Sequence, residues 1–426
     1  MGGLLRICTA GNVDDGKSTL IGRLLYDAQG VYEDQVRSVT RASCGRSAGP
    51  IDFSLFTDGL RAEREQGITI DVAYRYFATP RRKFILADTP GHEQYTRNMA
   101  TGASTADLAI VLVDARHGVR VQSRRHARIA RLLGIRHCVL AVNKMDLVDF
   151  DRGTFEAICR DFEPLAGDAA VHAIPLSALD GDNVTTRSGR TPWFDGAPLL
   201  EHLESVQVSE RLIQGPLRFP VQLVSRPNAD FRGYAGQVLS GTVRTGDPVT
   251  VWPSGRTTRV KRIVTWDGDL EVAFAPMSVT LVLADDLDVS RGDILADGRA
   301  DVARAFEAEI VWMDERPLDP ARPYLMKHGT TVVTAEIDRP FALNDIGRAI
   351  LTASRSVVFD PYHRNRGSGS FILIDPASNF TAGAGMVLHP VHADGGTGVS
   401  TGAAERLARA ARGAASEVEA ADAVRR

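Results

Sequence analysis

The residues with the clearest chemistry form a glycine-rich loop near the start of the sequence. Residues 11–18 read Gly-Asn-Val-Asp-Asp-Gly-Lys-Ser, which fits the pattern G-x-x-x-x-G-K-S. The two glycines let the backbone curl, so that successive N–H groups point inward at phosphate oxygens. Lys17 is then placed to reach the β- and γ-phosphates of a nucleotide, and the Ser18 hydroxyl to bind Mg²⁺. The loop therefore predicts a nucleotide-binding protein that uses magnesium.

The segments on either side of this loop fit the same interpretation. The apolar run 4–10 predicts a strand, and the leucine and isoleucine spacing in 20–25 predicts a helix. The alternative, a glycine turn with an incidental lysine, requires neither element. Lysine is also rare, at five positions against forty-five arginines, so Lys17 stands where a compact point charge is needed.

Two later segments complete the predicted phosphate site. Asp88 follows the apolar run 84–87 and can hold Mg²⁺ through a water molecule, while the Gly91 N–H can bond the γ-phosphate. His92 can orient the attacking water. Thr69 lies in a polar region that can fold over Mg²⁺ and the γ-phosphate. Each signal alone is more often a turn, but their order after the glycine-rich loop makes them strong.

The motif Asn-Lys-Met-Asp at 143–146 predicts which base is bound. The Asp146 carboxylate has two acceptor oxygens, which match the N1–H and exocyclic amine of guanine. Asn143 can meet the O6/N7 side of the base, and the Lys144 stem can cover its ring. A backbone N–H from the segment 175–179 can bond guanine O6. A turn after a strand is the alternative, but together with the phosphate loop the motif predicts GTP.

The complete predicted site falls into four groups. The catalytic residues are Lys17, Thr69 and His92. The phosphate-binding residues are Gly11, Asn12, Val13, Asp14, Asp15, Gly16, Lys17, Ser18, Thr19 and Gly91. The guanine-binding residues are Asn143, Lys144, Asp146, Ser177, Ala178 and Leu179. The Mg²⁺ ligands are Ser18, Thr69 and Asp88.

The order of elements predicts an α/β domain over residues 1–212. Continuous apolar runs at 84–87, 108–113 and 138–142 are typical of parallel strands that are covered on both faces. Helix-period segments near 95–101, 122–133 and 152–165 alternate with these runs. We therefore expect a doubly wound, mostly parallel sheet with its site at the carboxyl ends of the strands.

After residue 212 the pattern changes to short alternating runs separated by turn residues. This pattern predicts a β-barrel domain over 213–300 and a second one over 301–390, with strands at 329–333 and 370–374 among others. Neither segment has a cluster of catalytic residue types. The Gly- and Ala-rich segment 391–426 is predicted to be a flexible tail.

Composition excludes several classes of protein. A net charge of −3 and a pI near 6.4 do not fit a dedicated nucleic-acid binder. The cysteines show no C-x-x-C spacing, so we expect reduced thiols and no zinc site: Cys8, Cys44, Cys138 and Cys159. We find no signal peptide and no apolar run of membrane-spanning length. We therefore expect a cytoplasmic protein without a membrane partner.

One segment is unusually basic. Seven arginines lie between 116 and 136, and four of them recur near one face of the predicted helix: Arg120, Arg124, Arg128 and Arg131. A solvated helix face is the simpler interpretation. A docking surface for an acidic partner is the alternative.

Longer strings give a more specific indication. Residues 13–26 (VDDGKSTLIGRLLY), 58–74, 91–104 (GHEQYTRNMATGAS) and 343–347 resemble the large, GTP-hydrolysing subunits of bacterial sulfate adenylyltransferases. These subunits belong to the translation-factor class of P-loop GTPases, which includes elongation factor Tu. The resemblance covers about residues 4 to 390.

The resemblance implies a function and a partner. A separate small subunit would condense ATP and sulfate into adenylylsulfate and pyrophosphate, and GTP hydrolysis by this chain would drive that step. The resemblance does not place ATP or sulfate sites in this chain. No arginine in the phosphate motifs is an evident arginine finger, and Arg64 is a weak candidate, so we expect slow GTP hydrolysis by the chain alone. The alternatives are a translational GTPase that binds aminoacyl-tRNA and a regulatory GTPase switch.

Overall fold

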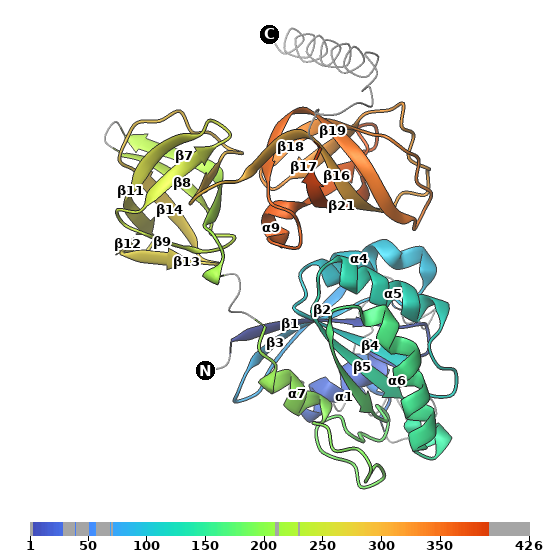
Figure 1. Ribbon diagram of the computed structural model, residues 1–426. Helices are drawn as coiled ribbons and strands as arrows, with labels where there is room; N and C mark the ends of the chain where they lie inside the picture. Colours follow the sequence, from blue (N-terminus) through green and yellow to red (C-terminus); the bar gives the residue numbers. More distant parts are fainter. Residues whose placement is uncertain are drawn as a thin grey trace. The chain divides into compact units, whose positions relative to one another are not determined.

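The computed structural model describes residues 3–28, 39, 51–56, 69, 71–208, 213–228 and 231–391. The chain divides into two compact units, Met1–Glu210 and Arg211–Arg426 (Figure 1). The predicted candidates Arg64 and Cys44, and the predicted tail after Val391, lie outside the described residues.

The first unit is built on a six-stranded sheet in the order β2-β3-β1-β4-β5-β6. Its strands are β1 (Leu4–Ala10), β2 (Ala73–Ala78), β3 (Lys83–Asp88), β4 (Leu108–Asp114), β5 (His137–Asn143) and β6 (Ala170–Pro175). Only the edge strand β2 runs antiparallel to its neighbour, so the predicted mostly parallel sheet is confirmed. All seven residues of the central strand β4 are buried, because helices cover both faces of the sheet.

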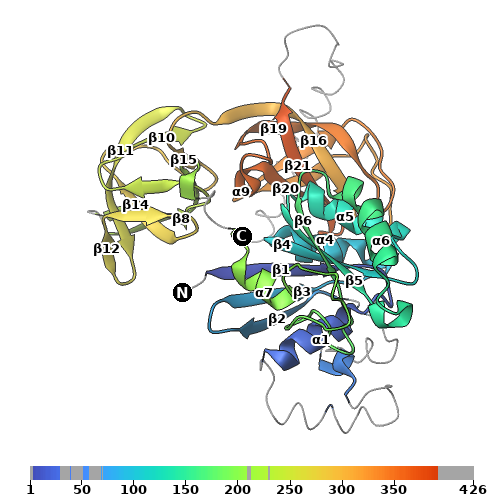
Figure 2. The ribbon, with the colours of Figure 1, turned by 60° about the horizontal axis from the view of Figure 1, so that its bottom comes forward.

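The helices lie in two layers. Figures 1 and 2 show α4, α5 and α6 on one face of the sheet, and α1 and α7 on the other. Their bounds are α1 (Lys17–Asp27), α4 (Thr96–Ser104), α5 (Val121–Leu132), α6 (Arg152–Ala166) and α7 (Leu199–Ser205). Three 3-10 turns are η1 (Phe53–Phe56), η2 (Glu93–Tyr95) and η3 (Met145–Val148). The sequence predicted the first four helices but not α7, β2 or β6.

The second unit contains two β modules. In the first module, β10-β15-β7-β8-β14-β11 follow one another, and pairing of β10 with β11 joins the two ends of this row. The strands are β7 (Arg218–Asn228), β8 (Phe231–Gln237), β9 (Thr242–Arg244), β10 (Pro248–Trp252), β11 (Arg256–Thr265), β12 (Gly268–Leu270), β13 (Val272–Phe274), β14 (Ser278–Leu283) and β15 (Ile294–Ala296). Strand β12 extends the sheet beyond β11, and β9 pairs with β13 separately.

The second module is a closed barrel in the order β16-β19-β18-β17-β20-β21. Its elements are β16 (Asp301–Trp312), β17 (Tyr324–His328), β18 (Thr331–Ile337), β19 (Ile346–Phe359), α9 (Arg366–Gly369), β20 (Ser370–Ile374) and β21 (Thr381–Pro390). The predicted strand 370–374 is confirmed. The predicted strand 329–333 is wrong at its start, because Gly329 has φ +55° and lies in the turn between β17 and β18.

Buried polar groups join the two β modules. Arg218 of β7 is 3% exposed, and its Nε and Nη2 donate to the two carboxylate oxygens of Asp360, each at 2.8 Å. The Ser368 hydroxyl donates to the same carboxylate at 2.6 Å, and Asn365 Nδ2 donates to Ser240 Oγ at 2.9 Å. The contacts of Arg218 with Asp360 and of Asn365 with Ser240 cross from one module to the other, which explains why the two modules form one unit.

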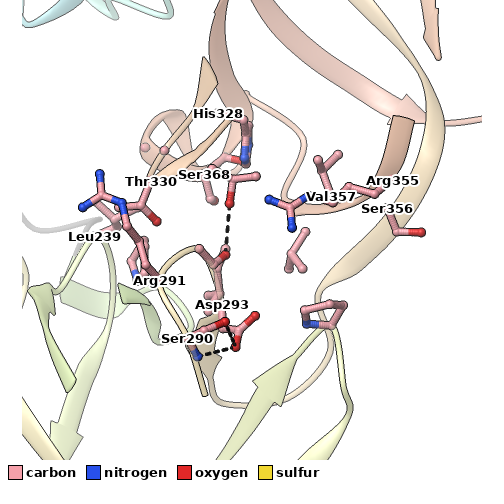
Figure 3. A pocket seen from close by; sticks show the side chains of 18 residues that line it. Leu239, Ser290, Arg291, Asp293, His328, Thr330, Arg355, Ser356, Val357 and Ser368 are labelled. Carbon is pink, nitrogen blue, oxygen red and sulfur yellow. Dashed lines mark hydrogen bonds between the residues drawn. The ribbon is translucent and has the colours of Figure 1, made fainter. Parts of the chain in front are cut away.

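A cavity of about 260 Å³ also lies between the two modules. Figure 3 shows its lining, which includes the buried His328 and the arginines Arg291 and Arg355. His328 Nε2 is 2.8 Å from the Ser368 carbonyl oxygen, and burial lowers the pKa of His328. The cavity contains none of the predicted site residues.

Three cysteines lie in the part of the chain that the structure describes. Cys8, Cys138 and Cys159 are free, and burial raises the pKa of Cys8 and of Cys138 to about 12. Within the part of the chain that the structure describes, no helix is long and apolar enough to span a membrane. The same part holds no group of three His, Cys, Asp or Glu residues suited to a metal ion.

Candidate nucleotide site

The loop between β1 and α1 has a backbone that only glycine allows at two positions. Gly11 has φ +147° and Gly16 has φ +91°, both in the region that side chains with a Cβ rarely adopt. A Cβ on Gly11 would lie 2.8 Å from the Leu112 carbonyl oxygen, and one on Gly16 would collide with the Asn143 amide. The curled loop predicted from the sequence is therefore present and packs against the ends of β4 and β5.

Lys17 lies inside this loop. Its side chain is buried, and Nζ donates to the carbonyl oxygens of Asn12 at 2.7 Å and Gly11 at 3.3 Å. Burial lowers the pKa of Lys17, and the carboxylates of Asp88, Asp15 and Asp14 oppose that shift. The loop thus holds a cation that is only partly compensated by protein groups, which suits it to bind an anion.

The segment after β3 reaches the same place. A Cβ on Gly91 would collide with Lys17 Nζ and lie 2.8 Å from the backbone of Asn12 and Val13. Asp88, at the end of β3, is 2% exposed and accepts a hydrogen bond from Thr9 Oγ1 at 3.3 Å. The structure therefore brings together segments that lie more than seventy residues apart in the sequence.

The surroundings of Thr69 and His92 are described less fully than those of Lys17. Both are half-buried, and His92 Nδ1 accepts the Gln94 N–H at 3.3 Å. The His92 ring centroid lies 5.9 Å from that of Tyr95. The residues around Thr69, which are 57–68 and 70, lie outside the described part, and the site is described without them.

Helix α5 supports the loop through contacts that the sequence did not predict. The Gly11 N–H donates to His126 Nδ1 at 3.1 Å, and Asn12 Nδ2 donates to Ser123 Oγ at 3.0 Å. Both side chains are buried, and burial lowers the pKa of His126 to about 3. The signal in the sequence was two polar residues, three positions apart, on the apolar face of a helix.

The motif 143–146 lies at the end of β5 and is tied to the loop. Asn143 Nδ2 donates to the Asp15 carbonyl oxygen at 2.8 Å, and Asn143 Oδ1 accepts the Ala178 N–H at 2.9 Å. Asn143 therefore joins the phosphate loop to the segment 177–179. Its amide retains one N–H and one lone pair for a ligand.

Lys144 has φ +62° and forms an ion pair that the sequence did not predict. Its Nζ lies 3.0 Å from Asp114 Oδ2 and also donates to the Asp14 carbonyl oxygen. Burial alone would raise the pKa of Asp114, but hydrogen bonds from Arg116 and Lys144 hold it well below its usual range. Asp114 thus fixes the direction of the Lys144 side chain.

Asp146 is half-buried, and its carboxylate accepts no hydrogen bond from the residues that the structure describes. In the segment 177–179, Ser177 is fully buried and its Oγ accepts the Asp180 N–H at 3.3 Å. The carbonyl oxygen of Leu179 accepts from Arg23 Nη1 at 3.0 Å. The Asp146 oxygens therefore remain available to a base.

Comparisons with known proteins agree with this geometry. Residues 3–215 match the elongation factor Tu GTP-binding domain family, and residues 338–388 match the family described as GTP-eEF1A C-terminal domain-like. Sulfate adenylyltransferase subunit 1 of Bacteroides thetaiotaomicron is 53% identical, over 91% of this chain and 87% of that protein. The protein of the same name from Tolumonas auensis is 52% identical, over 90% and 86%. The bifunctional enzyme NodQ of a Rhizobium species is 53% identical, over 91% of this chain and 63% of NodQ.

The loop, the sheet and the first of these matches define a P-loop GTPase domain of the elongation factor Tu class, followed by β barrels. At about half identity over most of both chains, the chain belongs to the sulfate adenylyltransferase subunit 1 family.

Proposed function

We propose that this chain is the GTP-hydrolysing subunit of a two-subunit sulfate adenylyltransferase in the cytoplasm. Hydrolysis of GTP here drives a small partner subunit to form adenylylsulfate and pyrophosphate from ATP and sulfate. The observation that carries the proposal is the identity, over most of the chain, to proteins named subunit 1 of this enzyme. The glycine loop with its buried, partly compensated Lys17 supports the GTPase part.

The phosphate end of the site binds and orients the triphosphate. Lys17, which now bonds loop carbonyls, turns to the β- and γ-phosphates, and the loop amides of 11–19 bond their oxygens. The Gly91 N–H bonds the γ-phosphate, and His92 orients the attacking water.

Magnesium fits this end of the site because the available groups are oxygen donors. Asp88 is a buried carboxylate beside Lys17, and Ser18 opens helix α1 directly after it. These two residues and Thr69 would hold the ion. When bound, Mg²⁺ neutralises charge on the transferring phosphoryl group.

The base end selects guanine. Asp146 accepts the N1–H and the amine, and the Lys144 stem, directed by Asp114, covers the ring. Asn143 positions the segment 177–179 and reaches the N7 side. Because Ala178 already donates to Asn143, the Leu179 N–H is the better donor to guanine O6, and Ser177 shapes the turn.

We also propose functional boundaries for the chain. The GTP-binding domain spans 1–212, the two barrel domains span 213–300 and 301–390, and the segment 391–426 is an appended tail. The contacts between Arg218 and Asp360 support a barrel pair that acts as one body.

The test is release of pyrophosphate from ATP and sulfate by the purified small subunit, with and without this chain and GTP. We expect GTP to increase release only when both subunits are present, and GTP hydrolysis by this chain to rise in the complex. No stimulation would contradict the proposal. Salt-dependent binding of aminoacyl-tRNA would instead support the translational alternative.

A further inference from the structure

The outer side of helix α5 carries a row of arginines. We call Arg120, Arg124, Arg128 and Arg131 the arginine face. All four are exposed, and their spacing of four, four and three residues places them on one side of the helix. Helix α5 lies between α4 and α6 on one face of the sheet (Figure 1). Because the four arginines are exposed, they point away from the sheet.

The arginine face has no charge partner in the described structure. No side chain of the four donates a hydrogen bond or forms an ion pair with a described residue, whereas Arg152 on α6 pairs with Glu156 at 2.7 Å. Like charges four residues apart repel one another on a helix. The first turn of α5 also lacks an acidic residue, although Arg120 and Arg124 lie at the end where the helix dipole disfavours cations.

These features are unfavourable for the helix alone but suited to binding carboxylates. We propose that the arginine face of α5 docks an acidic surface of the small partner subunit; this rests on the function proposed above. The guanidinium group forms paired hydrogen bonds with carboxylates, which makes such a row specific as well as attractive. A protein fits better than a nucleic acid, because the chain is acidic overall, with net charge −3.

The opposite side of α5 contacts the phosphate loop and so connects the arginine face with the proposed nucleotide site. Ser123 and His126 point inward and bond the phosphate loop at Asn12 and Gly11. A partner held on the outer face is therefore separated from the loop by one helix. Any coupling through this helix is reciprocal, so that partner binding and nucleotide binding would each change the affinity of the other by the same factor.

The test reverses two charges of the face in the full chain, as Arg124→Glu with Arg128→Glu. The matched control is Arg97→Glu with Arg160→Glu, two exposed arginines on α4 and α6. Association with the purified small subunit is followed at low and high salt. We expect the α5 variant to associate about ten-fold more slowly at low salt, with the difference shrinking as salt rises, and the control to match the unmodified chain.

Three readouts separate the outcomes. GTP binding by each variant shows that the first unit is folded, and Arg124→Lys with Arg128→Lys should restore most of the association rate. Equal rates for the α5 variant and its control would overturn the docking proposal. Loss of RNA binding in place of loss of subunit binding would also overturn it. If the unmodified chain does not bind the small subunit at all, the proposed function fails instead.

Discussion

The two units both bury polar side chains, but they use them differently. In the first unit, the buried Lys17 and the half-buried Asp146 lie at the carboxyl edge of the sheet and keep atoms that protein groups do not satisfy. In the second unit Arg218 and Asp360 bond each other in two places and join one β module to the other. Burial of charge therefore does not distinguish the two units, whereas incomplete satisfaction of the polar atoms does.

The largest effect is expected at Lys17. Replacing Lys17 with alanine removes the cation inside the loop, and charge-assisted hydrogen bonds contribute about 1.5–3 kcal/mol each. With two phosphates contacted, GTP affinity should fall by about 10² to 10⁴-fold, measured by equilibrium binding of labelled GTP. Lys17→Arg should also fail to restore binding, because a planar fork does not fit the space between Asn12 and Gly91. Retained binding in Lys17→Ala would place the phosphates elsewhere.

The second unit should respond in stability and not in nucleotide binding. Arg218→Ala removes the charged partner of the buried Asp360 carboxylate, which costs about 3–5 kcal/mol in the free energy of unfolding. Chemical denaturation measures the loss, while GTP affinity should stay unchanged. The control is Arg262→Ala, which breaks an exposed pair with Asp269 and should cost less than about 1 kcal/mol. Equal costs for the two variants would show that the buried contact does not join the modules.

Asp146 tests the unsatisfied end of the first unit. Asp146→Asn replaces one acceptor oxygen with a donor, which mismatches the amine of guanine but matches the second carbonyl of xanthine. We expect GTP affinity to fall by about 10²-fold or more and xanthosine triphosphate to become the preferred ligand. Competition between the two nucleotides measures this preference. An unchanged preference for GTP would remove Asp146 from the base pocket.

The sequence predicted those features that depend on local order. The loop around Lys17 is flanked by the predicted strand and helix, and the runs before Asp88 and Asn143 are strands β3 and β5. The prediction from sequence failed where the local pattern is ambiguous. The hairpin turn at Gly329 was predicted as strand because β-favouring residues follow it directly. The edge strand β2 was also missed, since its pairing to β3 lies outside its own sequence.

Contacts between distant residues could not be predicted. His126 contacts Gly11, which lies 115 positions away in the sequence, and Ser123 contacts Asn12, which lies 111 positions away. No short window of the sequence therefore contains both partners. The pairing of Lys144 with Asp114 is of the same kind. The sequence indicated the residues that we propose to face a ligand, while the groups that hold those residues in place required the fold.

The smallest effect is expected at His202, a half-buried histidine outside the proposed nucleotide site. His202 on α7 stacks on His172 with ring centroids 4.1 Å apart, and burial, with the charges of His172 and His137, lowers the pKa of His202 to about 4. The unfolded chain takes up a proton near pH 6.5 that the folded chain refuses, so stability falls as pH decreases from about 6.5 to about 4. His202→Gln should reduce this slope by up to about 1 kcal/mol per pH unit in denaturation experiments, whereas His363→Gln, at an exposed site, should not. An unchanged slope in His202→Gln would show that His202 takes up its proton in the folded chain as readily as in the unfolded one.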